Sequence, residues 1–315
     1  KELDRRKPGQ SKYVTQRKES DKVEILSGVF EGKTTGTPIG LLVRNTDQKS
    51  KDYENIKDKF RPGHADFTYQ QKYGIRDFRG GGRASARETV MRVAGGAIAK
   101  KVLEKKGVIV RAGVMQIGDI VADSHNFSDV SKNDFNFVDK SKVKALENFF
   151  KELIKDQDSI GAKIIVNISG LQPGVGSPVF SKLDAELAKS LMSVNAVKAI
   201  EIGTGVDSVT MRGSENRDII SVDGFETNNS GGILGGISNG DDINIFTSLK
   251  PTSSISQKTT TTNIDNQKVD LEVKGRHDPC VGLRAVPILE AMAALTIIDQ
   301  MLIDKAQCFD VERKS

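Results

Sequence analysis

The sequence predicts an α+β protein whose strands pair in antiparallel sheets. Short β-branched segments bounded by turn residues come in groups. Segments with helical spacing of apolar residues recur only at long intervals between those groups. A doubly wound fold would alternate strand and helix regularly, and this chain does not. Its 315 residues allow either two domains or one large domain.

The spacing of apolar residues predicts four helices. In the first, Ser85 and Glu88 have the spacing of a capping box, and Gly107 is expected to end the helix. Gly95 and Gly96 in its middle cost helix stability, so they predict close packing against another backbone. The expected helices cover residues 85–107, 141–155, a segment that follows Ser181, and 284–302.

Six short segments rich in β-branched residues are predicted strands. Two polar segments, 123–139 and 256–267, are rich in Asn, Asp, Ser or Thr and are expected to be surface loops or hairpin tips. The expected strands cover residues 108–118, 163–169, 198–203, 208–212, 243–249 and 269–274.

Composition excludes several classes of protein. Two cysteines, Cys280 and Cys308, cannot build a disulfide framework or a four-cysteine zinc site, and they favour a reducing, cytoplasmic location. The longest apolar stretch, residues 285–298, is interrupted by Glu290 and is shorter than the ~18 residues that a membrane span needs. No secretory signal opens the sequence. We therefore expect no membrane association.

Positive charge is concentrated in the first third of the chain. Residues 1–107 carry 25 Lys/Arg and 14 Asp/Glu, whereas the whole chain has a net charge of +5. Such asymmetry indicates an anionic partner, either nucleic acid or a small phosphorylated ligand. Because no nucleic-acid-binding signature is present, we expect no nucleic acid. A solvated basic surface is the alternative interpretation.

Two glycine-rich segments could approach a ligand through their backbone. Residues 79–85, RGGGRAS, lead from three glycines into a capped helix, an arrangement that suits an oxyanion. The spacing of a P-loop is absent. Residues 230–240 contain five glycines among aliphatic residues, which is unlike a flexible linker. The alternatives are a tight turn for the first segment and a packed bend for the second.

Three further motifs carry polar groups suited to chemistry. Lys250-Pro-Thr-Ser-Ser254 follows a predicted strand and could clamp a phosphate, although Ser/Thr-rich turns are common. Asp278 lies among basic residues in 274–280, where a fixed carboxylate suits proton transfer or simply forms an ion cluster. His64 follows a Pro-Gly turn in 60–66. Neither HExxH nor GxSxG occurs, so neither a metal site nor a serine hydrolase is expected.

In combination these segments resemble the chorismate synthase family. The resemblance extends over nearly the whole chain and keeps the family's order. It is carried by DRRKPGQSKY (4–13), EILSGVFEGKTTGTPIG (24–40), RNTDQKSKDY (44–53), FRPGHAD (60–66), YGIRDFRGGGRASARET (73–89), DSIGAK (158–163), NAVKAIEIG (195–203), GGILGGISNG (231–240), KPTSS (250–254) and KGRHDPCVGLRAVPILEAM (274–292).

The resemblance implies the last step of the shikimate pathway. In that step 5-enolpyruvylshikimate 3-phosphate loses phosphate and a ring proton in a 1,4-elimination that gives chorismate. The family uses reduced FMN without net redox change, and some members reduce it with NADPH. The resemblance further implies a single domain over residues 1–315, a β-α-β sandwich with helices between antiparallel sheets, and a homotetramer.

The resemblance also implies roles for individual residues. His64 and Asp278 match the catalytic positions. Arg6 and Lys12 match positions that bind the nicotinamide cofactor and also suit the substrate, and Arg61 and Arg87 are expected to hold substrate anions. The positions matching the flavin site are Arg83, Ala84, Ser85, Asn195, Ala196, Gly235, Lys250, Pro251, Thr252, Ser253, Ser254 and Arg276.

One family segment has no counterpart in this sequence. The family begins with Gly-Glu-Ser-His-Gly, whose histidine is implied to protonate the departing phosphate, and the sequence starts downstream of it. We therefore expect the chain to lack the family's N-terminal segment. The alternative function is a catalytically impaired remnant that still binds flavin and phosphate.

Overall fold

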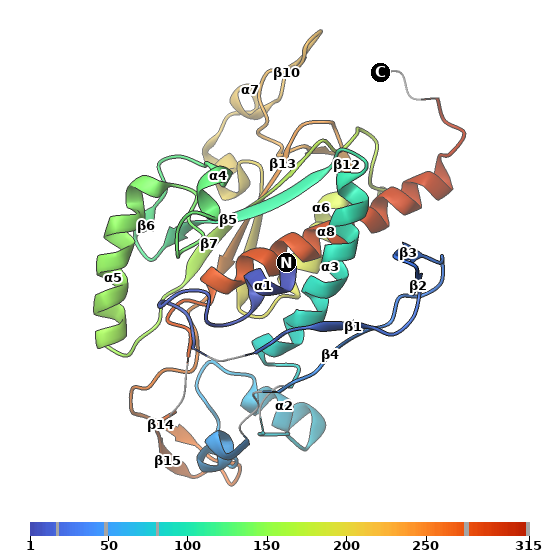
Figure 1. Cartoon of the computed structure of the whole chain (residues 1–315). Helices are drawn as coiled ribbons and strands as arrows, with labels where there is room; N and C mark the ends of the chain where they lie inside the picture. Colours follow the sequence, from blue (N-terminus) through green and yellow to red (C-terminus); the bar gives the residue numbers. More distant parts are fainter. Residues whose placement is uncertain (17–18, 47–49, 80–81, 274–276, 313–315) are drawn as a thin grey trace.

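In the computed structural model, an antiparallel sheet of five strands organises the fold (Figure 1). The structure describes residues 1–16, 19–46, 50–79, 82–273 and 277–312. Within the sheet, adjacent strands pair in antiparallel register, which confirms the predicted sheet type. The strand order is β6 (Ile120–Val121), β5 (Ile109–Ile117), β7 (Ala162–Ser169), β13 (Ile243–Leu249) and β8 (Val197–Ile202).

The central strand β7 buries side chains on both faces of the sheet. Ile164 and Val166 point into the main core, while Ile165 packs with Val130 and Val138 in a smaller core on the other face. The smaller core is supplied by α4 (Phe127–Val130) and the chain after it. The segment 123–139, expected as a surface loop, therefore contains a short helix and covers part of the sheet.

A layer of helices covers the face of the main core. Helix α8 (Gly282–Gln307) packs on β5 and β7, and α3 (Thr89–Glu104), α6 (Leu183–Met192) and α1 (Glu2–Arg6) pack against α8 (Figure 1). Helix α3 contacts strands of two sheets, β5 and β4 (Leu41–Val43), the latter paired with β1 (Val23–Ile25). Among the described residues, the second β layer is this two-stranded pair.

The four predicted helices are confirmed with shifted ends. The first begins as a 3-10 turn, η2 (Ala86–Glu88), and continues as α3. Only half of its expected capping box forms: Ser85 Oγ accepts from the N–H of Arg87, whereas Glu88 pairs with Arg92. The second comprises η3 (Lys140–Lys142) and α5 (Val143–Lys155), and the other two are α6 and α8.

The predicted strand over 208–212 is wrong. Residues Gly205–Thr210 form the 3-10 helix η4, followed by α7 (Gly213–Asn216). Hydroxyls of Ser208 and Thr210 donate to carbonyls three residues back, which favours a turn over a strand. Val209 is 86% exposed, so no core face stabilises an extended segment there.

The remaining strands form two-stranded pairs. The polar segment 256–267 lies in one of these hairpins, as expected, and that hairpin ends at Leu271, earlier than predicted. The pairs are β2 (Val29–Phe30) with β3 (Lys33–Thr34), β9 (Ile220–Ser221) with β10 (Gly224–Phe225), β11 (Ile233–Leu234) with β12 (Ile237–Ser238), and β14 (Thr259–Thr262) with β15 (Lys268–Leu271).

Helix α8 is long and apolar enough to cross a membrane, with a mean hydropathy of 1.7 over its best window. Its position explains that composition, since it is buried beneath the sheet and beside α3. Glu290 in its middle is 3% exposed and accepts from Arg5, Lys100 and the N–H of Ala112. A buried charge with these partners marks α8 as a core helix.

The two glycines of α3 predict opposite effects of the same substitution. A Cβ at Gly96 would overlap the backbone and side chain of Ala291 in α8, so Gly96→Ala is expected to lower the free energy of unfolding by about 1–3 kcal/mol. A Cβ at Gly95 would meet only Leu295 Cδ2, at 3.9 Å, so Gly95→Ala should raise it by about 0.5–1 kcal/mol. Urea denaturation measures both, and equal stabilities would contradict this helix packing.

Candidate functional site

Three of the predicted motifs meet at the end of strand β13. The strand ends at Leu249, and the N–H of Lys250 donates to the carbonyl of Ala196 at 2.9 Å. Lys250 Nζ and Ser253 Oγ both donate to the carbonyl of Gly63, the latter at 2.7 Å. The KPTSS segment therefore holds the loop of His64 on one side and residues 195–196 on the other.

The KPTSS segment keeps polar capacity after these bonds are made. Lys250 Nζ also donates to Ser253 Oγ at 3.0 Å, so two of its three N–H groups have partners in the protein. Among the described residues, Thr252 Oγ1 is buried and has no hydrogen-bond partner. An ammonium with a spare donor, two residues before a buried hydroxyl that lacks a partner, fits an anionic group such as a phosphate.

His64 lies in a cluster of charged side chains centred on Asp66. Helix α2 (Asp66–Tyr73) begins at this aspartate, which is 3% exposed. Arg61 Nε and Nη2 donate to its two oxygens, both at 2.8 Å, and Arg76 Nη1 lies 2.9 Å from Oδ2. His64 Nδ1 lies 2.8 Å from Oδ1 and 3.1 Å from Arg61 Nη2. Asp66 thus binds three basic side chains.

The charge of Asp66 is strongly favoured in this cluster. Burial alone would raise the pKa of its carboxyl, but hydrogen bonds from Arg61 and His64 outweigh burial and hold the pKa well below its ordinary range. Arg76 also donates to the carbonyls of Ile56 and Lys57, at the end of η1 (Ser50–Ile56). The cluster therefore ties the His64 loop to η1.

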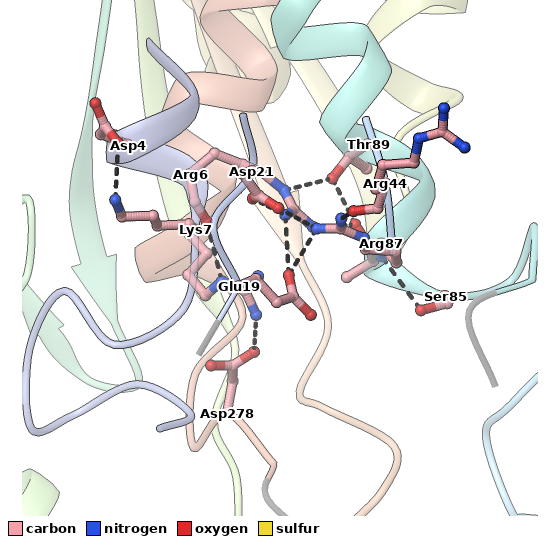
Figure 2. Close-up of polar contacts among 12 residues, drawn as sticks. Asp4, Arg6, Lys7, Glu19, Asp21, Arg44, Ser85, Arg87, Thr89 and Asp278 are labelled. Carbon is pink, nitrogen blue, oxygen red and sulfur yellow. Dashed lines mark hydrogen bonds and ion pairs between the residues drawn. The ribbon is translucent and has the colours of Figure 1, made fainter. Parts of the chain in front are cut away.

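A second cluster of charged side chains contains two of the arginines that were predicted to bind substrate (Figure 2). Arg6 and Arg87 converge on Asp21 and Glu19, and Asp21 is buried. Arg6 is 1% exposed, and its other nitrogens donate to Thr89 Oγ1 and the carbonyl of Ala86. In this structure Arg6 and Arg87 fasten segment 19–21 to the start of α3.

The predicted catalytic carboxylate of Asp278 adjoins this second cluster (Figure 2). Its Oδ1 accepts from the N–H of Thr15 and its Oδ2 from Arg284 Nη1, both at 2.9 Å. Arg284 Nε donates to the carbonyl of Arg6. The side chain of Asp278 is 10% exposed, so it is fixed near the surface in one orientation. Arg276, two residues earlier, lies outside the described residues.

The structure spreads the other predicted positions more widely. Ser85 caps η2, while Arg83 beside it is exposed and has no ion-pair partner in the described part of the chain. Lys12 is exposed, with Nζ 5.0 Å from the ring centroid of Tyr13. Pro251 is exposed and Ser254 is 8% exposed within the KPTSS segment.

Gly235 does not join the group around Lys250. It lies exposed at the tip of the β11–β12 hairpin with φ +59°, and no atom lies within 4 Å of an added Cβ. The carbonyl of the next residue, Gly236, accepts from the N–H of Leu183 at the start of α6. Asn195 follows the other end of that ten-residue helix, about 15 Å away. The chain thus places Gly235 and Asn195 at opposite ends of α6.

Asp66 and Arg76 were missed as site residues by the sequence analysis. Both lie inside segments quoted for the resemblance, FRPGHAD and YGIRDF, but their spacing of ten residues matches no helix or strand contact. The acid two residues after His64 was the only available signal. Their pairing depends on the turn between α2 and the following chain, which the sequence pattern does not predict.

The depressed pKa of Asp66 predicts a pH-dependent contribution to stability. Because the folded-state pKa lies below the ordinary 3.8, the ionised carboxylate stabilises the fold above that value. This contribution is lost as the pH falls toward the folded-state pKa. Below about pH 4 the unfolding free energy of the wild type should therefore fall more steeply than that of Asp66→Asn. Urea denaturation across this range measures both slopes, and equal slopes would contradict the assignment.

Comparisons with known proteins identify the family of this chain. A family model described as chorismate synthase matches residues 1–302. A solved structure described as a crystal structure of chorismate synthase is 27% identical, with a TM-score of 0.71, and the match covers 89% of this chain and 78% of that one. The fold class and the family resemblance predicted from the sequence are confirmed: the chain belongs to the chorismate synthase family.

Proposed function

We propose that this chain converts 5-enolpyruvylshikimate 3-phosphate to chorismate by 1,4-elimination of phosphate, the last step of the shikimate pathway. The observation that carries the proposal is the meeting of the His64 loop, residues 195–196 and the KPTSS segment at the end of β13 in a member of this family. Family membership favours a lyase over the non-catalytic remnant.

The residues at this site fit reduced FMN. Its phosphate would be held by the spare N–H of Lys250 and the hydroxyls of Thr252, Ser253 and Ser254, and the exposed Arg83 would add a second cation. When bound, reduced FMN supplies electron density for cleavage of the allylic C–O bond. Backbone groups of Ser85, Asn195 and Ala196 would line the flavin, together with Ala84, Pro251 and Arg276, whereas Gly235 would reach a flavin site only from another protomer.

The chain's own residues would manage charge and protons around that reaction. His64, backed by an anionic Asp66, would hold or move a proton at its outer ring nitrogen. Asp278, fixed by Arg284 and the N–H of Thr15, would accept a proton during elimination. Exposed cations such as Arg83 and Lys12 would attract the phosphate and the two carboxylates of the substrate.

The remaining properties that the resemblance implies complete the proposal. We infer that the protein is a cytoplasmic homotetramer. We also infer that an external reductant, and not this chain, reduces the flavin that it binds. In a homotetramer, the hairpin that carries Gly235 could face a flavin site from another protomer. NADPH in place of a chemical reductant tests whether the chain reduces flavin itself, and light scattering tests the assembly.

An anaerobic assay tests the function directly. The chain is mixed with chemically reduced FMN and 5-enolpyruvylshikimate 3-phosphate, and chorismate is followed by its absorbance. We expect chorismate to form with flavin and substrate both present and not when either is omitted. Absence of product, with reduced FMN still bound, would overturn the proposed activity and leave a binding protein.

A lysine pair tests the assignment of the phosphate clamp. Lys250→Met removes one charge-assisted donor and is expected to weaken reduced-FMN binding about 10–100-fold. Lys258→Met makes the same change in net charge at an exposed lysine before β14 and should leave binding unchanged. Anaerobic titration of flavin fluorescence measures both. Equal affinities for the two variants would place the flavin phosphate elsewhere.

A further inference from the structure

The distance between His64 and Asp66 restricts where a proton can lie. Nδ1 of the imidazole and Oδ1 of the carboxylate are 2.8 Å apart, which is hydrogen-bond distance. If neither atom carried a proton, two lone pairs would face each other at that distance. One of the two atoms must therefore be protonated.

The surroundings of Asp66 decide which atom carries the proton. Two arginines bind its carboxylate, Arg61 through two nitrogens and Arg76 through one, and the side chain is 3% exposed. Protonating a carboxylate between two guanidinium groups would forfeit three charge-assisted contacts. The proton therefore belongs to Nδ1 of His64.

The same arrangement fixes the other ring nitrogen. With a proton on Nδ1, a neutral imidazole has a bare Nε2 that accepts a hydrogen bond, and an imidazolium donates from Nε2. Arg61 Nη2, which donates one N–H to Asp66 Oδ1, also lies 3.1 Å from Nδ1. Even if its second N–H were aimed at a bare Nδ1, lone pairs of Nδ1 and Oδ1 would still face each other at 2.8 Å. Across the loop, Lys250 and Ser253 hold the carbonyl of Gly63, the residue before His64. Asp66 thus holds the ring and the KPTSS segment holds the backbone before it, with 23% of the His64 side chain exposed.

We propose that Asp66 is a positioning residue that keeps Nδ1 of His64 protonated and thereby assigns proton exchange with the bound ligands to Nε2. Arg61 and Arg76 hold Asp66 ionised and in place for this role. Arg61, predicted from the sequence to bind substrate, then acts on the reaction through Asp66 and His64. The inference rests on the proposed function, because only in that function does His64 act on the ligands.

The tautomer of His64 can be measured without substrate or flavin. Long-range ¹H–¹⁵N correlation spectra distinguish protonated from bare ring nitrogens, and the chain has only three histidines to assign. His64→Gln identifies the signals of His64 by their loss. In the neutral state of the wild type we expect a protonated Nδ1 and a bare Nε2. A protonated Nε2, or an even mixture of tautomers, would overturn the proposal whatever any variant does.

Asp66→Asn tests the consequence for catalysis. The amide keeps the shape of the side chain but can donate to Nδ1, which would shift the proton to Nε2. We expect kcat to fall about 10²-fold or more, since a wrong tautomer removes general acid–base catalysis. Affinity for reduced FMN should change by no more than about twofold, because the phosphate clamp is unaltered.

A matched control separates this effect from a general loss of stability. Asp129 in α4 is also a buried aspartate near a cation, Lys132, on the far side of the sheet from the helix layer. Asp129→Asn should leave kcat and the His64 tautomer unchanged. Asp66→Asn with the wild-type tautomer and kcat would overturn the proposal. If the wild type forms no chorismate but shows the expected tautomer, the proposed function is wrong, while the proposal that Asp66 positions His64 is supported.

Discussion

A single carboxylate inside an apolar helix holds the layers of this protein together. Glu290 in α8 receives two bonds from Arg5, one from Lys100 and one from the N–H of Ala112. Those partners come from α1, α3 and β5. A buried carboxylate without partners would cost several kcal/mol, so each of these elements is fixed relative to α8. The close contact of Gly96 with Ala291, one position along α8, requires the same alignment.

The fixed position of α1 also orients residues that were predicted to belong to the site. Arg6 follows Arg5, and since adjacent residues of a helix point in different directions, Arg6 turns away from Glu290 toward Asp21. Asp21 in turn binds Arg87, just after Ser85. The first turn of α8 meanwhile supplies Arg284, which holds Asp278. Core packing and the orientation of Arg87 and Asp278 therefore depend on one connected set of charged contacts.

The concentration of lysine and arginine in the first third has a structural use that was not predicted from the sequence. We attributed it to an anionic ligand. The structure shows that many of these arginines bind internal carboxylates: Arg5 binds Glu290, Arg6 and Arg87 bind Asp21, and Arg61 and Arg76 bind Asp66. A count of basic residues treats an arginine paired with a carboxylate and a free cation alike, so it cannot distinguish the two uses. The exposed Arg83 and the spare donor of Lys250 retain the ligand-binding interpretation.

Whether a feature could be predicted from the sequence depends on how far apart in the chain its interacting residues lie. Strand β13 was predicted with its observed bounds because its apolar alternation is local and one face is buried. The predicted strand over 208–212 was wrong because its β-branched residues do not pack against a core. The motifs around Gly63 and Lys250 were both identified, but their contact joins residues 187 positions apart. No periodicity encodes such a contact, and a family resemblance transfers residues without transferring their hydrogen bonds.

The contact between Gly63 and Lys250 also places a physical condition on the site. Both Lys250 and Ser253 donate to one carbonyl, and φ of +67° at Gly63 directs that carbonyl at them. A side chain at this position would be strained, and its Cβ would lie 3.2 Å from Ser253 Oγ. An anion that draws on the hydroxyl or ammonium must share them with this carbonyl. The KPTSS segment and the histidine loop are thus joined by the groups that we propose to bind the phosphate, so the position of one constrains the other.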